Sequence, residues 1–340
     1  MKPNIFSIAT KELHQDAFIA WLLQWADPSN RQYNEALYQT GTNFVKALLQ
    51  KNHDIGNAEI TKVKASRQWE NIDVNVEVET TESKYLIVIE DKTYTSEREG
   101  QLERYRTSGE NWCKKHNAQL GCVYLKTGSE SEKRLRIIRG RGFKTFNRKE
   151  FIALLDSYPA TGNEILLDFR ARLHQLQKAH DAFETTVIGQ WNNECWIGFY
   201  QFLEQNMGIV DWHLVNPPGG GSFWNAVLNW EYWFGFPVYL QIEQGKLCFK
   251  ISHGDSDIED YSRSQIRNLW YEVIRKNAAA KKDSTIHRPE RFGSGYYMTS
   301  AVVYKADWLG DAEKLISKDE VIQRLAHYKM FMESLLEVKR

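Results

Sequence analysis

The fold of the chain's first half is decided by one stretch, Tyr85-Leu-Ile-Val-Ile-Glu-Asp-Lys92. Its four central residues are apolar, uninterrupted and mostly β-branched, which predicts a central strand buried on both faces. The stretch then ends in three charged residues. Because successive side chains of a strand point to opposite faces, Glu90 and Lys92 share one face while Asp91 points away.

The preceding segment, residues 71–79, alternates polar and apolar residues, which is typical of a half-buried strand. If the two strands pair as a hairpin across residues 80–84, Asp73 and Glu90 both lie far from the turn and meet at one edge of the sheet. Two carboxylates beside the ammonium of Lys92 suit a hard divalent cation and a water that attacks a phosphodiester.

This arrangement resembles the PD-(D/E)XK nuclease superfamily, whose pattern is an Asp on one strand and Glu-x-Lys on the next. Asp73 and Glu90-Asp-Lys92 carry the pattern here. Residues 11–23 and Gln101-Leu-Glu-Arg-Tyr105 extend the resemblance to the bacterial branch with an N-terminal Glu helix and a Gln-Leu-x-x-Tyr helix. Coverage is roughly the first 150 residues. Ile72 stands where the family's name has Pro, and Asp91 fills the variable position.

The resemblance implies a restriction-endonuclease-like α/β core, a mixed sheet flanked by helices. It also implies an enzyme that hydrolyses phosphodiester bonds with Mg²⁺ or Mn²⁺, and DNA is a more expected substrate than RNA. The implied metal ligands are Glu12, Asp73, Glu90 and the backbone carbonyl of Asp91. In the same scheme Lys92 stabilises the attacking hydroxide or the charged phosphate, and Gln101 positions the nucleophile.

Glu12 lies at the start of an expected helix, residues 11–25, for which Thr10 is the expected N-cap. The helix is apolar almost all round, as buried helices are, and a buried carboxylate needs a partner or a metal. The family gives an acidic residue on this helix a role in the metal site. The alternative is an ordinary acid favoured by the helix dipole. Asp16, one turn later, is a second candidate.

A capping-box pattern at residues 96–99 predicts a helix that reaches about His116. Gln101 and Tyr105 are then four residues apart on one face, where they look toward the end of the Glu90 strand. Neutral donors there could orient the attacking water or the scissile phosphate. An exposed helix face without a catalytic role is the alternative.

The strongest basic run is residues 133–144, whose charges beside an acidic metal site suit a polyanionic substrate. A charged hairpin that faces solvent explains the run equally well. The candidate phosphate contacts are Arg134, Arg136, Arg139, Arg141 and Lys144, with Tyr105 as a further contact to the nucleic acid.

The length of 340 residues predicts two domains. We expect a nuclease-like domain at 1–160, a bridging helix at 161–187 and an aromatic-rich α+β domain at 188–340, for target recognition, partner binding or dimerisation. Aromatic residues at 224–236 could stack bases, although a domain core is their usual place. Lys and Arg balance Asp and Glu at 44 each, so any phosphate-binding surface must arise from local clustering.

Four scattered cysteines, no secretory signal and no long apolar run predict a cytoplasmic protein with reduced thiols and no membrane span. No His or Cys cluster supports zinc. Two alternatives to a nuclease stay open. One is a catalytically silent module on a nuclease fold, which binds nucleic acid or protein. The other is a structural ion pair of Glu90 and Lys92, which a like-charged Asp73 disfavours unless a cation is present. The biological pathway, whether restriction, defence or repair, is not indicated.

Overall fold

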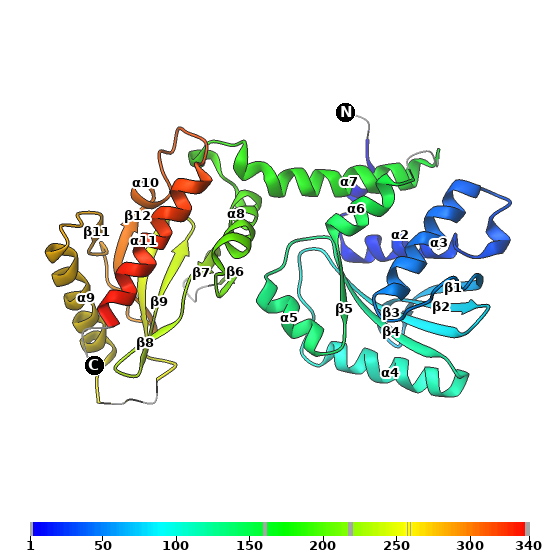
Figure 1. The fold of residues 1–340 in the computed structure, drawn as a ribbon, viewed down its shortest axis with the longest axis horizontal. Helices are drawn as coiled ribbons and strands as arrows, with labels where there is room; N and C mark the ends of the chain where they lie inside the picture. Colours follow the sequence, from blue (N-terminus) through cyan, green and yellow to red (C-terminus); the bar gives the residue numbers. More distant parts are fainter. Residues whose placement is uncertain (1–2, 159–161, 217–219, 257, 259, 337–340) are drawn as a thin grey trace. The chain divides into compact units, whose positions relative to one another are not determined.

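The structure is a computed structural model that describes residues 3–158, 162–216, 220–256, 258 and 260–336. The chain forms two compact units, one from residues 1–130 and 134–178 and the other from 131–133 and 179–340. The division falls inside helix α7 (Glu164–Asp181), which lies within the range 161–187 expected for a bridging helix (Figure 1). The expected boundary at 160–161 lies outside the described residues.

The first unit is built on a five-stranded sheet in the order β1-β2-β3-β4-β5. The antiparallel strands β1 (Ile60–Trp69), β2 (Ile72–Thr80) and β3 (Lys84–Lys92) follow one another along the chain. Strands β4 (Gln119–Lys126) and β5 (Lys144–Asn147) then run parallel to β3. The sheet is therefore mixed, as expected for a restriction-endonuclease-like core.

Strand β3 is central and buried along nearly its whole length, from Tyr85 to Lys92. Its hairpin with β2 pairs Val74 with Ile89 and Glu79 with Lys84, so the turn lies at residues 81–83. The predicted register is confirmed, and it brings the beginning of β2 to the end of β3.

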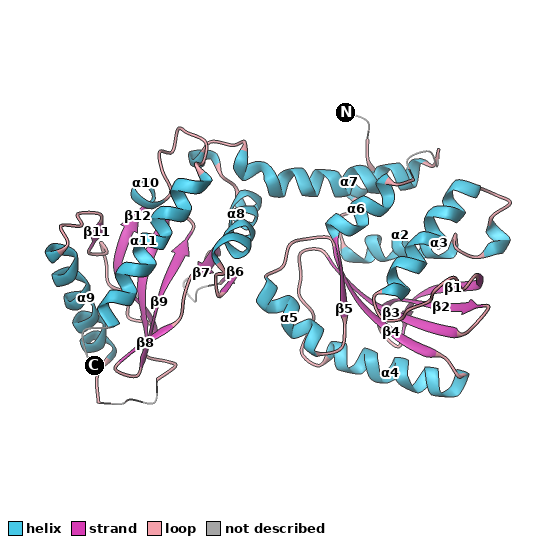
Figure 2. Ribbon diagram, in the orientation of Figure 1, coloured by secondary structure: helices cyan, strands magenta, loops and turns pink. Residues whose placement is uncertain are grey.

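Helices cover both faces of this sheet (Figure 2). Residues of α2 (Glu12–Gln24), α3 (Glu35–Gln50), α6 (Arg148–Asp156) and α7 share one hydrophobic core with one face of the strands. Residues of α4 (Gln101–His116) and α5 (Glu132–Gly140) form a second core on the opposite face. Short helices α1 (Ile5–Ile8) and η1 (Pro28–Asn30) complete the unit.

Two local predictions are wrong, and one alternative is excluded. Helix α2 begins at Glu12 after Lys11, and no side chain caps it, so Thr10 is not the N-cap. Helix α4 begins at Gln101 rather than near Ser96, because residues 95–98 are irregular and lead into a turn at Glu99 and Gly100, where Gly100 adopts the left-handed conformation (φ 68°). The basic run forms α5 and the start of β5 instead of a hairpin.

The second unit has a sheet in the order β11-β12-β10-β9-β7-β6, with β8 paired to β9. Its strands are β6 (Asp211–Val215), β7 (Phe223–Val227), β8 (Glu231–Trp233), β9 (Phe236–Glu243), β10 (Lys246–Ser252), β11 (Ile286–His287) and β12 (Tyr297–Tyr304). Its helices are η2 (Ala182–Glu184), η3 (Ile188–Gln190), α8 (Asn193–Met207), α9 (Arg263–Ala280), α10 (Lys305–Trp308) and α11 (Lys318–Leu336).

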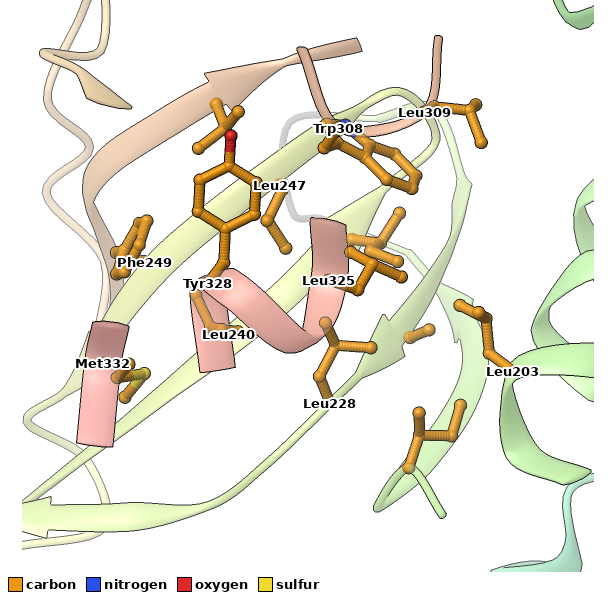
Figure 3. Close-up of a cluster of buried hydrophobic side chains, with 14 of the residues drawn as sticks. Leu203, Leu228, Leu240, Leu247, Phe249, Trp308, Leu309, Leu325, Tyr328 and Met332 are labelled. Atoms are coloured by element: carbon orange, nitrogen blue, oxygen red, sulfur yellow. The ribbon is translucent and has the colours of Figure 1, made fainter. Parts of the chain in front are cut away.

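Most aromatic side chains of this unit serve its core. Figure 3 shows Tyr328 and Met332 of α11 against Leu240 and Phe249 of the sheet. In the segment 224–236, for which a domain core is the usual reading and base stacking the alternative, Phe236 is buried, whereas Tyr232 and Phe234 are exposed. The α+β architecture predicted for 188–340 is present in the residues described.

Candidate active site

The end of β3 places a carboxylate and an ammonium side by side. The Lys92 Nζ atom lies 2.5 Å from Glu90 Oε1, and neither residue is more than slightly exposed. Asp91 points to the other face, where its Oδ1 accepts a hydrogen bond of 2.6 Å from Gln15 on α2. The alternation predicted from the sequence is therefore the arrangement found.

Asp73, at the start of β2, joins this pair. Its Oδ2 lies 3.4 Å from Lys92 Nζ and accepts a hydrogen bond of 3.2 Å from the Asp91 backbone N–H. The Asp91 carbonyl in turn accepts a bond of 3.0 Å from Lys92. The hairpin thus brings Asp73 and Glu90 onto one ammonium group, as the pairing of the strands requires.

Glu12 reaches the site from the first turn of α2. Its carboxylate accepts hydrogen bonds from the Thr93 and Thr95 backbone N–H groups, at 2.9 and 3.2 Å, and from the Thr95 hydroxyl, and lies 4.0 Å from Lys92 Nζ. Partial burial raises the pKa of Glu12, but these bonds outweigh it, and the pKa lies below its usual value. Glu12 is therefore an ionised, fixed carboxylate.

Burial and neighbouring charges shift the pKa values of Glu90 and Lys92. Burial and the nearby charge of Asp73 raise the pKa of Glu90 to about 8, although Lys92 opposes the shift. Burial lowers the pKa of Lys92, but the charges of Glu90 and Asp73 more than compensate and raise it above its usual value. Like-charged carboxylates packed this closely need a cation among them, and the Lys92 ammonium supplies one.

Gln101 opens α4 and fixes the second oxygen of Glu90. Its Nε2 donates to Glu90 Oε2 at 3.0 Å and contacts the Tyr105 hydroxyl at 2.8 Å. Tyr105 donates to the Asn71 carbonyl next to β2. Burial raises the pKa of Tyr105 to about 12, so its hydroxyl keeps its proton. The two residues predicted to share a helix face do so, and they tie α4 to both strands of the site.

A cleft of about 960 Å³ opens at these residues, lined by Glu12, Asp73, Lys92, Gln101 and Tyr105. Four of the five predicted catalytic residues, Glu12, Asp73, Lys92 and Gln101, line this cleft.

A sequence model of the PD-(D/E)XK nuclease superfamily matches residues 3–183, more than half of the chain. The chain belongs to the PD-(D/E)XK nuclease superfamily. No curated protein and no solved structure matches it. The matched span contains every element of the first unit and every residue of the cleft, so the superfamily assignment and the geometry concern the same site.

Members of this superfamily generally use divalent metal ions, and the donors present here suit such an ion. Asp73, Glu90 and Glu12 offer carboxylate oxygens, which hard cations prefer. Within the described ranges, no three Asp, Glu, His or Cys side chains already converge as a metal cluster. Lys92 lies among these acids, and its ammonium supplies positive charge that they share.

A second acidic pair lies behind the site on the α2 face of β3. The carboxyl groups of Asp16 and Asp91 are both buried and lie close enough to interact. Burial and the charge of Asp73 raise the pKa of Asp16 to about 7, and burial and the charge of Asp16 raise the pKa of Asp91 well above its usual value. Only the Asp91 carbonyl, not its side chain, faces Lys92.

The basic run of α5 is not arranged as a free phosphate-binding surface. Arg134 and Arg141 both pair with the buried Glu97, at 2.6 and 3.3 Å. Arg139 also has an interaction partner, whereas Arg136 and Lys144 are exposed. None of the five lines the cleft.

Two other arginines line the cleft instead, Arg98 just before α4 and Arg104 within it. Both are exposed, and neither pairs with a carboxylate in the described part of the chain. Arg98 has no basic neighbour and Arg104 has only Arg106, so a search for the densest basic run misses both. Their positions, six residues apart on either side of the start of α4, are the sequence feature that could indicate them.

Proposed function

We propose that the chain is a Mg²⁺-dependent nuclease that hydrolyses phosphodiester bonds of DNA at the Asp73, Glu90 and Lys92 site. The observation that carries the proposal is the convergence of two carboxylates, those of Asp73 and Glu90, on one buried ammonium, 3.4 and 2.5 Å away, at the wall of a cleft that Asp73 and Lys92 line. Asp73, Glu90 and Glu12 would hold the cation. When bound, it supplies positive charge and Lewis acidity at the scissile phosphate.

The protein's own groups supply the rest of the chemistry. In hydrolysis a water oxygen bonds to phosphorus, the bond to one ester oxygen breaks, and that oxygen leaves with a proton. Negative charge grows on the phosphate in between. Lys92 keeps its proton, since its pKa is raised, and its ammonium stabilises that charge. Gln101 holds Glu90 in place, and Arg98 and Arg104 bind flanking phosphates.

A cleavage panel tests the proposal. Single- and double-stranded forms of DNA and RNA are incubated with Mg²⁺, Mn²⁺ or chelator, using the wild-type chain and Asp73→Asn. We expect metal-dependent cleavage of at least one DNA form by the wild-type chain and none by the variant. Cleavage of RNA alone would overturn the choice of DNA. Salt-dependent binding without any product would favour the silent nucleic-acid-binding module.

The setting of this activity is part of the proposal. All four cysteines are free and buried, in keeping with reduced thiols in the cytoplasm. No helix among the described residues is long and apolar enough to span a bilayer. We propose a role in restriction, defence or repair, and a homodimer that brings two sites to two strands. Size measurement in solution with and without a DNA duplex tests the dimer, and a monomer under both conditions would contradict it.

A further inference from the structure

The second unit carries a cluster of arginine and aromatic side chains that the core does not use. The segment from Tyr261 to Tyr297 contains eight Lys or Arg residues against three Asp or Glu, in a chain whose overall charge is zero. The segment therefore carries a net positive charge, and a run with four acids, residues 255–260, directly precedes it in the sequence. This segment comprises α9, β11 and the loop that leads into β12.

Residues on successive turns of α9 hold that loop. Arg263 donates to the Ser294 carbonyl at 2.9 Å, and Arg267 donates to the Gly293 carbonyl at 2.8 Å. One turn on, Tyr271 packs edge-on against Phe292, with the ring centroids 5.7 Å apart. The loop is thus fixed to the helix by contacts that leave parts of the arginines free.

The guanidinium groups gather on aromatic rings rather than on carboxylates. Arg267 and Arg288 lie 4.4 and 4.8 Å from the centre of the Phe292 ring, and Arg263 lies 4.9 Å from that of Tyr296. Among the residues described, none of these arginines forms an ion pair with an acid. Partial burial and the charge of Arg288 lower the pKa of Arg267, so the two like charges are close enough to interact. An anion on this surface would relieve their repulsion.

Open aromatic surface adjoins the arginines. Arg263 covers part of the Tyr296 ring, yet Tyr296 remains 56 % exposed. Arg288 and Arg291 are also exposed. Cations spaced along a surface beside an open ring are what unpaired nucleotides require, because the cations meet phosphates and the ring stacks a base.

We propose that this arginine-aromatic surface, formed by Arg263, Arg267, Arg288, Arg291, Phe292 and Tyr296, binds a single-stranded segment of nucleic acid. The choice of nucleic acid as the ligand rests on the nuclease function proposed above. In this proposal the second unit binds an unpaired strand. Arg288 and Arg291 contact phosphates, and Tyr296 stacks a base.

Binding of a fluorescein-labelled single-stranded oligodeoxynucleotide to the full-length chain in chelator tests the surface without cleavage. We expect Arg288→Ala/Arg291→Ala to weaken binding about tenfold at moderate salt. The slope of log affinity against log salt should also fall, by about 0.7 for each phosphate that the variant no longer binds. Tyr296→Ala should weaken binding, whereas Tyr296→Phe keeps the ring and should bind as the wild type does.

The matched control is Arg275→Ala, an exposed arginine of the same helix that is already paired with Glu272, at 2.7 Å. Because its charge is already partnered at the surface, its removal should change affinity less than about twofold.

Two results would overturn the surface proposal. One is equal binding by the double variant and by Arg275→Ala. The other is that poly-glutamate at equal charge displaces the oligonucleotide and that Tyr296→Ala leaves the affinity for the oligonucleotide unchanged. That result would indicate a site for an acidic protein. Cleavage measured in parallel separates the two proposals. If the double variant binds the oligonucleotide as the wild type does and the wild type cleaves DNA, only the surface proposal is rejected. If binding needs Arg288 and Arg291 but the wild type cleaves nothing, only the nuclease activity is rejected.

Discussion

Lys92 acts as an internal cation for the acidic residues of the cleft. Its ammonium lies within 4.0 Å of carboxylate oxygens from Glu12, Asp73 and Glu90, which belong to three different elements. Without it, two of these carboxylates would lie close together and largely buried, which is strongly unfavourable. Lys92 therefore stabilises the arrangement of these acids, and in the proposed mechanism it also stabilises the charge of the transition state.

The metal-free chain should lose stability as pH rises from about 4.5 to about 8. Glu90 has a pKa raised to about 8 when folded, so the folded chain binds more protons than the unfolded chain across this window. Its contribution is present at low pH and is lost as pH rises through the folded value. Asp16, with a pKa raised to about 7, acts in the same direction.

Thermal unfolding in chelator, from about pH 5 to about pH 9, measures this dependence. We expect Glu90→Gln to flatten it, because the amide does not titrate. Saturating Mg²⁺ should flatten it as well, since a cation favours the ionised carboxylate. If the unfolding temperature of the wild type changes with pH in parallel with that of Glu90→Gln, the pKa of Glu90 is not raised by folding.

Thr95 should matter for catalysis through Glu12. The Thr95 hydroxyl donates to both oxygens of Glu12, at 2.8 and 2.7 Å, so Thr95→Val leaves only backbone donors to hold it. We expect a loss of about tenfold in single-turnover cleavage, with weaker metal binding by calorimetry. The control Thr61→Val removes an exposed hydroxyl of β1 and should leave both unchanged. A Thr95→Val variant with wild-type rates would show that Glu12 needs no such support.

At this scale the sequence predicts the residues but not what holds them. Glu90 and Lys92 share a face because of strand alternation alone, and Asp73 follows from the hairpin. The bonds from Thr93 and Thr95 to Glu12 connect residues more than 80 positions apart, and no local pattern indicates them. The roles of these residues in catalysis remain predictions.

Helix α2 is positioned by a close approach to α3. A Cβ atom at Gly41 would lie 2.6 Å from the Leu22 carbonyl oxygen and 2.8 Å from the Ala26 nitrogen, both backbone atoms of the preceding helix and its end. Such atoms yield only if the helix moves. Because α2 carries Glu12, the separation of these helices affects the site.

Gly41→Ala should therefore lower the free energy of unfolding by about 1–3 kcal/mol, the usual cost of overpacking. Urea denaturation measures it. The control Gly140→Ala, at the end of α5, places a Cβ in open space and should leave stability unchanged or slightly higher. Equal effects of the two substitutions would mean that α2 and α3 do not pack as closely as described.

Among the elements, strands were predicted more accurately than helix starts. The alternation along β2 and the uninterrupted apolar run of β3 follow from packing against hydrophobic cores, so both are visible in the sequence. The start of α4 depends on the conformation of Gly100, which competes with a capping pattern at residues 96–99. The sequence leaves the basic run open between a phosphate-binding surface and a charged hairpin, because the pairing of Arg134 and Arg141 with the buried Glu97 is a tertiary contact that no local pattern indicates.

On the scale of the whole molecule, two units were expected from length and from the aromatic second half, and the chain has two. The proposed roles divide between them, with the chemistry in the first and strand binding in the second. Arg288→Ala/Arg291→Ala should then raise the concentration of DNA needed for half-maximal cleavage about tenfold, with little change in the rate at saturation. Hydrolysis of a small phosphodiester such as bis(p-nitrophenyl) phosphate, which cannot span the surface, should be unaffected. An equal loss with both substrates would place these arginines at the reaction itself.

The central claim is that Lys92 and the carboxylates around it hydrolyse phosphodiester bonds. The most direct measurement compares single-turnover DNA cleavage with Mg²⁺ by the wild type, Lys92→Ala and Lys84→Ala. Lys84 is an exposed lysine at the opposite end of the same strand, where it pairs with Glu79. The account predicts a loss of at least about 10²-fold for Lys92→Ala and wild-type cleavage for Lys84→Ala. Metal-dependent cleavage by a folded Lys92→Ala protein at the wild-type rate would contradict it.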